Sequence, residues 1–231
     1  MQGQREFTKT EWDSFLTGEA LAASLLGRML YSYPDKAWLQ SLADDDVFAE
    51  SPLGDAQPDV QRGLVLLQGW AQEQRGGMSS ESFDDLRVDY TRLFLGADRV
   101  LAPRWESVYF NEERMVFQEQ TMQVRAWYRR FGLEAANRNA EPDDHIGLEL
   151  GFMAHLAQQA LVALDQQDQS TFEHLLAVQR DFLSKHLLMW APQWCDLVEA
   201  QANTDFLRGI ALLTRGILAE IATILHAKAI A

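Results

Sequence analysis

Hydrophobic residues recur along most of this chain at the three- and four-residue spacing of helices that bury one face. Near the N-terminus this pattern runs from Trp12 to Leu30, and near the C-terminus it joins Ile210 to Ile224. No segment of the sequence alternates polar and apolar residues as a half-buried strand does, and no repeat of fixed length occurs. The pattern therefore predicts an all-α fold, a compact helical bundle of about eight to ten helices.

Helix boundaries are predicted from capping residues, prolines and glycines. The expected helices are one that ends at Pro34, then 35–43, 60–74, 80–95, 111–131, 142–165, 170–190, 192–202 and a last one from Thr204 onward. The segments 44–59 and 97–110 are expected to be loops. We expect one domain over residues 1–231, and its best candidate for a hinge, between the N- and C-terminal halves, is 137–141.

Four acidic side chains and a histidine lie together in the segment 141–150, EPDDHIGLEL. One interpretation is purely structural, because proline and carboxylates are favoured in the first turn of a helix. On this interpretation Glu141, Asp143 and Asp144 stabilise a helix start, and His145 caps it or pairs with Glu149 one turn later.

Two chemical interpretations of this segment are weaker. A metal site would use His145, Glu149 and Asp144, but His155 lies too far along the helix to complete it, so no metal is expected. A hydrolase could use Asp144 and His145 as an acid–base pair. The chain contains no Gly-x-Ser-x-Gly motif, no phosphate-binding glycine loop and no dinucleotide fingerprint, so we do not expect an enzyme.

A fourth interpretation is recognition of a cation, because grouped carboxylates form charge-assisted hydrogen bonds with arginine. Such pairs bind weakly unless an apolar surface lies beside them. The segment 89–111 offers one through its large side chains, Tyr90, Leu93, Phe94, Trp105, Tyr109 and Phe110. One alternative is that Tyr90, Leu93 and Phe94 are core residues of a helix, because they follow one another at spacings i, i+3 and i+4. The other expectation is an apolar groove, rimmed by Glu106 and Asp98, that holds an amphipathic helix or an extended peptide.

The charge of the chain narrows the choice of partner. There are 34 acidic against 20 basic residues, a net charge of −14. Such a surface disfavours nucleic acid and anionic membranes and attracts a basic peptide, although acidity also serves solubility alone.

The single cysteine, Cys195, permits no internal disulfide, and the apolar segment 209–227 is interrupted by Arg215 and Glu220. With no secretory signal at the start of the sequence, we expect a cytoplasmic protein without membrane insertion.

Two segments resemble the TorD/DmsD family of redox-enzyme maturation chaperones. The stretch DYTRLFLG…APRWESVYF is similar to that family's LF-G segment followed by a PPW-SV turn, and EPDDHIGLEL is similar to its E-P-x-D-H helix start. The resemblance implies an all-helical cytoplasmic chaperone, and we expect no cofactor. It also implies binding to the twin-arginine signal peptide, and to the body, of a molybdoenzyme catalytic subunit of the DMSO/TMAO reductase type. Cofactor loading would then precede export.

The resemblance also implies site residues. Matches to the family's leader-binding positions are Tyr90, Leu93, Phe94, Trp105, Asp144 and His145. Neighbouring residues that we add to the candidate site are Pro103, Glu106, Tyr109 and Glu141. The leader's hydrophobic stretch is expected to pack on Leu93, Phe94, Trp105 and Tyr109, and its arginines to meet Glu141, Asp144 or Glu106. His145 would orient Asp144 or sense pH.

One departure from the family pattern and two alternatives stay open. Relatives often have two prolines before the tryptophan, whereas this chain has Pro103-Arg104. A cation there is expected either to repel a twin-arginine leader or to alter the loop. The alternatives are an acidic helical scaffold without leader specificity and the hydrolase described above. Either a monomer or a homodimer fits the sequence.

Overall fold

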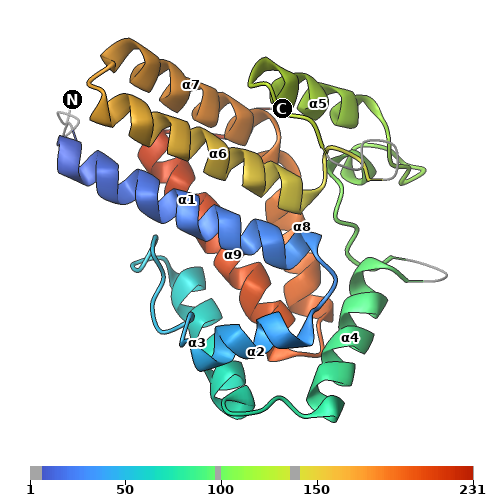
Figure 1. The fold of residues 1–231 in the computed structure, drawn as a ribbon. Helices are drawn as coiled ribbons and strands as arrows, with labels where there is room; N and C mark the ends of the chain where they lie inside the picture. The colour runs from blue at the N-terminus through green and yellow to red at the C-terminus, as the bar shows by residue number, and fades with distance from the viewer. Residues whose placement is uncertain (1–6, 97–99, 136–140, 231) are drawn as a thin grey trace.

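The chain forms a bundle of α-helices in the computed structural model, which describes residues 7–96, 100–135 and 141–230 (Figure 1). The helices are α1 Lys9–Tyr31, α2 Lys36–Asp44, α3 Pro58–Gln74, α4 Ser80–Phe94, the short 3₁₀ helix η1 Glu106–Tyr109, α5 Glu119–Arg130, α6 Ile146–Asp165, α7 Gln169–Lys185, α8 Leu187–Gln201 and α9 Asp205–Leu225. Nine α-helices and no strand occur in these described ranges. The all-α prediction is confirmed, and the helix count lies within the expected range.

The bundle is organised around α6 and α9. Helix α1 packs along α6, whose other side contacts α7, whereas α3 and α8 both pack on α9. Figure 1 shows α1, α6 and α7 side by side, with α9 passing behind α1 toward α3. Helix α4 stands at one edge, and α5 lies at another edge near the end of α7. Helices α4 and α5 therefore lie at the periphery of the bundle.

Local capping explains why several helices begin where they do. Thr8 and Glu11 form a reciprocal capping box at the start of α1. The Asp35 carboxylate accepts from the amide of Trp38 before α2, and the Ser79 hydroxyl accepts from Ser82 before α4. These contacts lie within four residues of sequence, so the sequence predicts the start of both helices to within one residue.

Large side chains from several helices fill the core. The bulkiest fully buried residues are Trp190, Trp194, Phe94 and Phe182. Cys195 lies beside Trp194 with no exposed surface, and burial raises the pKa of its thiol well above the usual value. Cys195 is therefore a packed thiol and not a nucleophile.

The prediction that a long helix begins at Asn111 is wrong, since α5 begins at Glu119. The Asn111 side chain instead closes a turn, accepting from the amide of Met115 (2.8 Å) and donating to the carbonyl oxygen of Ser107 (2.6 Å). Arg114 has a positive φ of 54°, which a right-handed helix excludes. An asparagine that caps a helix and one that closes a turn look alike in sequence, because both use local side-chain hydrogen bonds.

Two other boundaries differ from the prediction. Helix α6 begins at Ile146 and not at Pro142, and the break between α7 and α8 falls at His186 and not before Pro192. Pro192 lies inside α8, and His186 leaves helical geometry with φ −123° and ψ −87°. Residues 137–140 of the expected hinge lie outside the described ranges, and the expectation of a single domain stays a prediction.

Glycines allow α1 and α6 to approach closely. A Cβ atom placed on Gly147 would lie 2.7 Å from the carbonyl oxygen of Gly27 and 2.8 Å from Cβ of Tyr31. Real Cβ atoms do not approach backbone atoms so closely, so this contact needs glycine. One turn further along α6, a Cβ on Gly151 would meet nothing within 4 Å.

Gly147→Ala is expected to lower the free energy of unfolding by about 1–3 kcal/mol, because the added methyl group forces α1 away from α6. Gly151→Ala is the matched control on the same helix. It should leave the stability unchanged or raise it by up to about 1 kcal/mol, since alanine favours the helix. Urea unfolding followed by circular dichroism measures both. Equal effects of the two variants would contradict this account of the α1–α6 contact.

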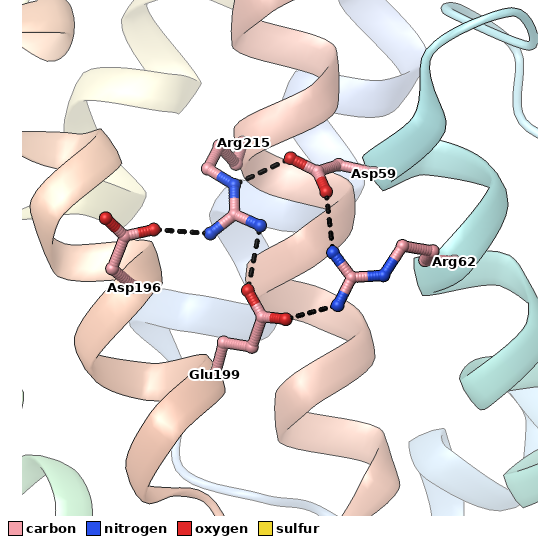
Figure 2. Close-up of polar contacts among 5 residues, drawn as sticks. All are labelled: Asp59, Arg62, Asp196, Glu199 and Arg215. Atoms are coloured by element: carbon pink, nitrogen blue, oxygen red, sulfur yellow. Dashed lines mark hydrogen bonds and ion pairs between the residues drawn. The ribbon is translucent and has the colours of Figure 1, made fainter.

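An ion-pair network joins α3, α8 and α9 (Figure 2). Arg215 Nε donates to Asp59 (2.7 Å), and its Nη2 donates to Glu199 (2.8 Å). Arg62 donates to the second oxygen of each of these carboxylates, and Arg215 also reaches Asp196. The hydrogen bond from Arg215 lowers the pKa of Asp59 from its ordinary value. The network therefore stabilises the fold while Asp59 is ionised.

Arg215→Met is expected to lower the free energy of unfolding by about 1–3 kcal/mol at neutral pH, because two partly buried carboxylates lose a charged donor. A carboxyl group whose pKa is depressed by folding contributes above its unfolded pKa and loses that contribution as the pH falls. The difference from the unaltered protein should therefore shrink below the ordinary Asp pKa of 3.8. Urea titrations over a pH series measure it, with the exposed Arg180→Met as control. A difference that grows in acid would contradict the prediction.

Candidate functional site

The two motifs singled out in the sequence are joined by backbone hydrogen bonds. The amide of Glu106 donates to the carbonyl oxygen of Asp144 (2.9 Å), and the amide of Ile146 donates to that of Arg104 (2.8 Å). These bonds form an isolated antiparallel bridge between Trp105 and His145. The loop that precedes η1 is thereby fixed to the N-terminus of α6, and the two motifs form one structural unit.

The Asp144 carboxylate reinforces this junction from inside the protein. One oxygen accepts from the amide of Ser107 (2.7 Å) and the other from the hydroxyl of Thr121 (2.7 Å). The Asp143 carboxylate accepts from Arg125 Nη2 (2.7 Å). Asp143 and Asp144 are both fully buried. Each carboxylate thus connects the start of α6 to η1 or α5.

His145 is the N-cap of α6. Its Nδ1 accepts from the amide of Gly147 (3.0 Å), so the neutral ring carries its proton on Nε2. Burial, with a smaller contribution from the Arg104 charge, lowers the pKa of His145 well below its usual value. No hydrogen bond joins His145 to Asp144 in the described part of the chain. The capping role expected for His145 is therefore observed, whereas its expected orientation of Asp144 is not.

Glu106 also points inward. Its Oε2 lies 2.9 Å from Nδ1 of His186, the residue between α7 and α8, and both side chains are 2% exposed. Burial is the first cause of the raised pKa of Glu106, and the charge of Asp144 acts in the same direction while His186 opposes it. The pair connects η1 to the α7–α8 junction, so Glu106 does not form the solvent-exposed rim expected from the sequence. The other expected rim residue, Asp98, lies outside the described residues.

Three of the aromatic and aliphatic candidates lie in the core. Tyr90, Leu93 and Phe94 on α4 are at most 2% exposed. Their placement agrees with the alternative in which they are core residues of a helix. They are therefore part of the packed interior and not of a solvent-facing surface.

Arg104 lies with its guanidinium group buried among aromatic rings. Its Nη1 donates to the carbonyl oxygen of Leu30 (2.7 Å) and to the hydroxyl of Tyr90. The guanidinium carbon lies 5.3 to 5.8 Å from the ring centroids of Tyr90, Phe94 and Trp105. The side chain is 5% exposed. Its cation therefore points into the protein, which removes the ground for expecting repulsion of a ligand at the surface.

A surface groove of about 660 Å³ has Trp105 in its lining. Its lining residues are Val100, Pro103, Trp105, Val108, Arg114, Met115 and Val116. Trp105 is half-buried, and its indole Nε1 donates to Oε1 of Glu141 (2.6 Å), which is also partly exposed. Tyr109 donates its hydroxyl proton to the carbonyl oxygen of Pro103 (2.8 Å). Of the ten candidate residues, Trp105, Tyr109 and Glu141 are the ones that keep exposed surface.

Sequence reasoning missed part of this groove. Met115 is 47% exposed, and together with Arg114 and Val116 it forms one wall. The sequence pattern places these residues within the helix predicted to begin at Asn111, but the structure has no helix at these positions. A useful signal was present, however, because a helical stripe cannot place the adjacent residues Met115, Val116 and Phe117 on one face.

The arrangement of the described residues supports neither the metal-site nor the hydrolase interpretation of the acidic segment. Within the described ranges no group of three or more His, Cys, Asp and Glu side chains is placed to hold a metal ion. Glu149 is buried and accepts from the indole of Trp190 (3.3 Å), and burial raises its pKa well above the usual value. Asp144 and His145, the acid–base pair of the hydrolase alternative, have no exposed surface.

Comparison with known proteins decides the family. The model of the family described as "Nitrate reductase delta subunit" matches residues 55–196, more than half of the chain. The chain belongs to this family. Its matched region includes α4, the groove, the bridge between the two motifs and most of α8.

Curated relatives of this nitrate reductase delta subunit family member carry chaperone names. The "Tat proofreading chaperone DmsD" of Salmonella typhi is 27% identical over 205 residues, 87% of each chain. The "Probable Tat proofreading chaperone DmsD" of Haemophilus influenzae is 31% identical over 142 residues, 62% of this chain and 63% of that one. A "Chaperone protein TorD" of Vibrio cholerae is 33% identical over 113 residues, 48% of this chain and 49% of that one. The TorD/DmsD resemblance predicted from the two motifs is confirmed.

None of the helices formed by the described residues has the length and apolar character that a membrane crossing requires. Helix α9, which contains most of the apolar segment 209–227, packs instead against α3 and α8.

Asp144→Asn is expected to lower the free energy of unfolding by about 1–3 kcal/mol, because an amide leaves Ser107 or Thr121 without a good acceptor in the protein interior. Thr121→Val removes one of these donors together with its demand for an acceptor, so it should cost less. Urea unfolding of the two variants measures the difference. A stability unchanged by Asp144→Asn would show that this carboxylate does not hold the junction.

Proposed function

We propose that this chain is a cytoplasmic chaperone that binds the twin-arginine signal peptide of a molybdenum-cofactor oxidoreductase and assists cofactor loading before export. The names of the relatives support a chaperone of this kind. The observation that carries the proposal is the apolar groove above Trp105, bordered by the carboxylate of Glu141. The client would be an enzyme of the DMSO/TMAO reductase type, with its body as a further partner.

The groove suits the hydrophobic stretch of a signal peptide. Trp105, Met115 and Val116 present apolar surface, and the 3₁₀ helix behind them is held by Asp144 and Glu106. Burying about 400 Å² of apolar leader surface would contribute about 10 kcal/mol before the cost of ordering the peptide. Because that ordering cost is large, the complex can be both micromolar or tighter and reversible.

Charge around the groove suits the two arginines of the leader. Glu141 is held against the Trp105 indole, and Glu112 and Glu113 are exposed next to groove residue Arg114. Partly exposed carboxylates bind guanidinium groups by charge-assisted hydrogen bonds without the full desolvation cost of a buried pair. On this proposal the buried candidates Tyr90, Leu93, Phe94, Asp144 and His145 act by positioning the groove from beneath.

Met115→Ser is expected to weaken binding of a synthetic twin-arginine leader at least tenfold, because the groove loses an apolar wall. The control is Met122→Ser on α5. Met122 is 50% exposed, close to the 47% of Met115, but it does not line the groove. Isothermal titration calorimetry at fixed salt measures both variants. Equal affinities for Met115→Ser and the unaltered protein would remove the groove from the leader-binding site.

Glu141→Gln is expected to weaken binding of the same leader about threefold to tenfold and to reduce the dependence of affinity on salt. The reason is that a neutral amide replaces the carboxylate in one arginine contact. Titrations at low and high salt measure both effects. A leader in which glutamines replace the two arginines is the control, and its affinity should not change with Glu141→Gln. A loss of affinity for this control leader equal to that for the arginine leader would contradict direct arginine–carboxylate contact.

A further inference from the structure

A second pocket of about 480 Å³ lies where α5 meets the end of α7. Its lining residues are Gln123, Ala126, Trp127, Arg130, Lys185, His186 and Ile230. It shares no lining residue with the groove above Trp105. In Figure 1, α5 lies beside the end of α7 at the edge of the bundle, so the pocket is at the periphery.

The charge of this pocket is opposite to that of the chain. The protein carries a net charge of −14, yet the lining includes Arg130 and Lys185 and contains no carboxylate. Arg130 forms no ion pair with a carboxylate within the described ranges. Lys185 contacts Asp181 at 3.2 Å, but both side chains are about half exposed, so water screens this pair. The positive charge of the pocket is therefore mostly available to a ligand.

The cations are held in place before any ligand arrives. The guanidinium carbon of Arg130 lies 4.4 Å from the ring centroid of Trp127, and the ammonium nitrogen of Lys185 lies 5.8 Å from it. His186 contributes a ring that is 2% exposed and is fixed through Nδ1 by Glu106 (2.9 Å). A pocket whose side chains are already ordered binds at a lower entropic cost than flexible surface lysines do.

We propose that this basic pocket binds an acidic segment of a partner polypeptide. Its carboxylates would meet Arg130 and Lys185, and its apolar side chains would pack on Trp127 and Ile230, which is 56% exposed. A nucleic acid carries a negative charge at every phosphate and would extend beyond the pocket over the acidic remainder of the protein, whereas a short acidic segment fits within it. A small free anion would gain nothing from the apolar half of the pocket. A short acidic peptide satisfies both the charge and the apolar surface.

This ligand differs from the one assigned to the groove. The groove, with Glu141 beside it, suits a basic peptide, whereas the basic pocket suits an acidic one. Because the two sites share no lining residue, both ligands can be bound at once. The proposal stands on the pocket's own residues and does not depend on the leader-binding function.

Fluorescence anisotropy with a labelled peptide of repeated Glu-Glu-Leu triplets tests the basic pocket. Arg130→Glu is expected to weaken binding at least tenfold, because a charge-assisted contact becomes a repulsion. Arg180→Glu makes the same change of charge on α7, at a residue that is half exposed and outside the pocket, and should weaken binding less than twofold. Equal weakening by both variants would show attraction to net charge alone and would overturn the proposal.

The apolar half of the pocket is tested separately. Ile230→Ser leaves every charge in place and is expected to weaken binding of the acidic peptide about threefold, because part of an exposed apolar contact is lost. A peptide of Gln-Gln-Leu triplets should not bind measurably. Displacement of the acidic peptide by millimolar inorganic phosphate, or no effect of Ile230→Ser, would indicate a site for small anions and would overturn the proposal.

Folding and independence from the groove are checked with the same samples. Circular dichroism establishes that Arg130→Glu and Ile230→Ser keep the helical content of the unaltered protein. A saturating twin-arginine leader should leave the acidic peptide bound. Competition between the two peptides would place them at one site and overturn the proposal of a separate basic pocket, whereas failure of leader binding alone would leave it intact.

Discussion

Two backbone hydrogen bonds, from Glu106 to Asp144 and from Ile146 to Arg104, fix the geometry of the whole candidate site. Loop backbone that is buried against a helix end must find partners for its amides and carbonyls. Here the loop before η1 and the segment before α6 supply each other's hydrogen-bond partners. Since the Asp144 side chain also accepts from Ser107, a single short segment holds the 3₁₀ helix and the start of α6 together. Trp105 is thereby presented at the surface in one orientation.

Burial divides the candidate residues into two groups with different physical roles. A buried ionisable group needs a partner, because its desolvation is costly. Glu106 has His186, Asp143 has Arg125, and Asp144 has two donors from the protein interior. These carboxylates are therefore paired inside the protein and stabilise the fold. The negative charge that a ligand can reach comes from the exposed carboxylates around the groove, of which Glu141 is the one in contact with Trp105.

The protein combines a strongly acidic total charge with a local basic pocket. Long-range attraction by the net charge of −14 favours any basic ligand, whereas Arg130 and Lys185 act only at short range, within the screening length of salt solution. An acidic segment would therefore bind best when another contact brings it close. A partner that offers a basic tag and an acidic surface would satisfy both sites, and the linked contacts would strengthen each other through effective concentration.

The sequence by itself determined the all-α class, most helix boundaries and the family, because periodicity, caps and motifs are local or linear properties. It placed the start of α4 at residue 80, where the capping hydroxyl of Ser79 lies within three residues of its donor. The break at His186 and the inward direction of Arg104 were decided by tertiary structure alone. His186 contacts Glu106 and Arg104 contacts Leu30, both remote in sequence, and only such contacts determine whether a charged side chain meets solvent or the core. The turn at Asn111 uses local hydrogen bonds, but these bonds look the same in sequence as those of a helix cap.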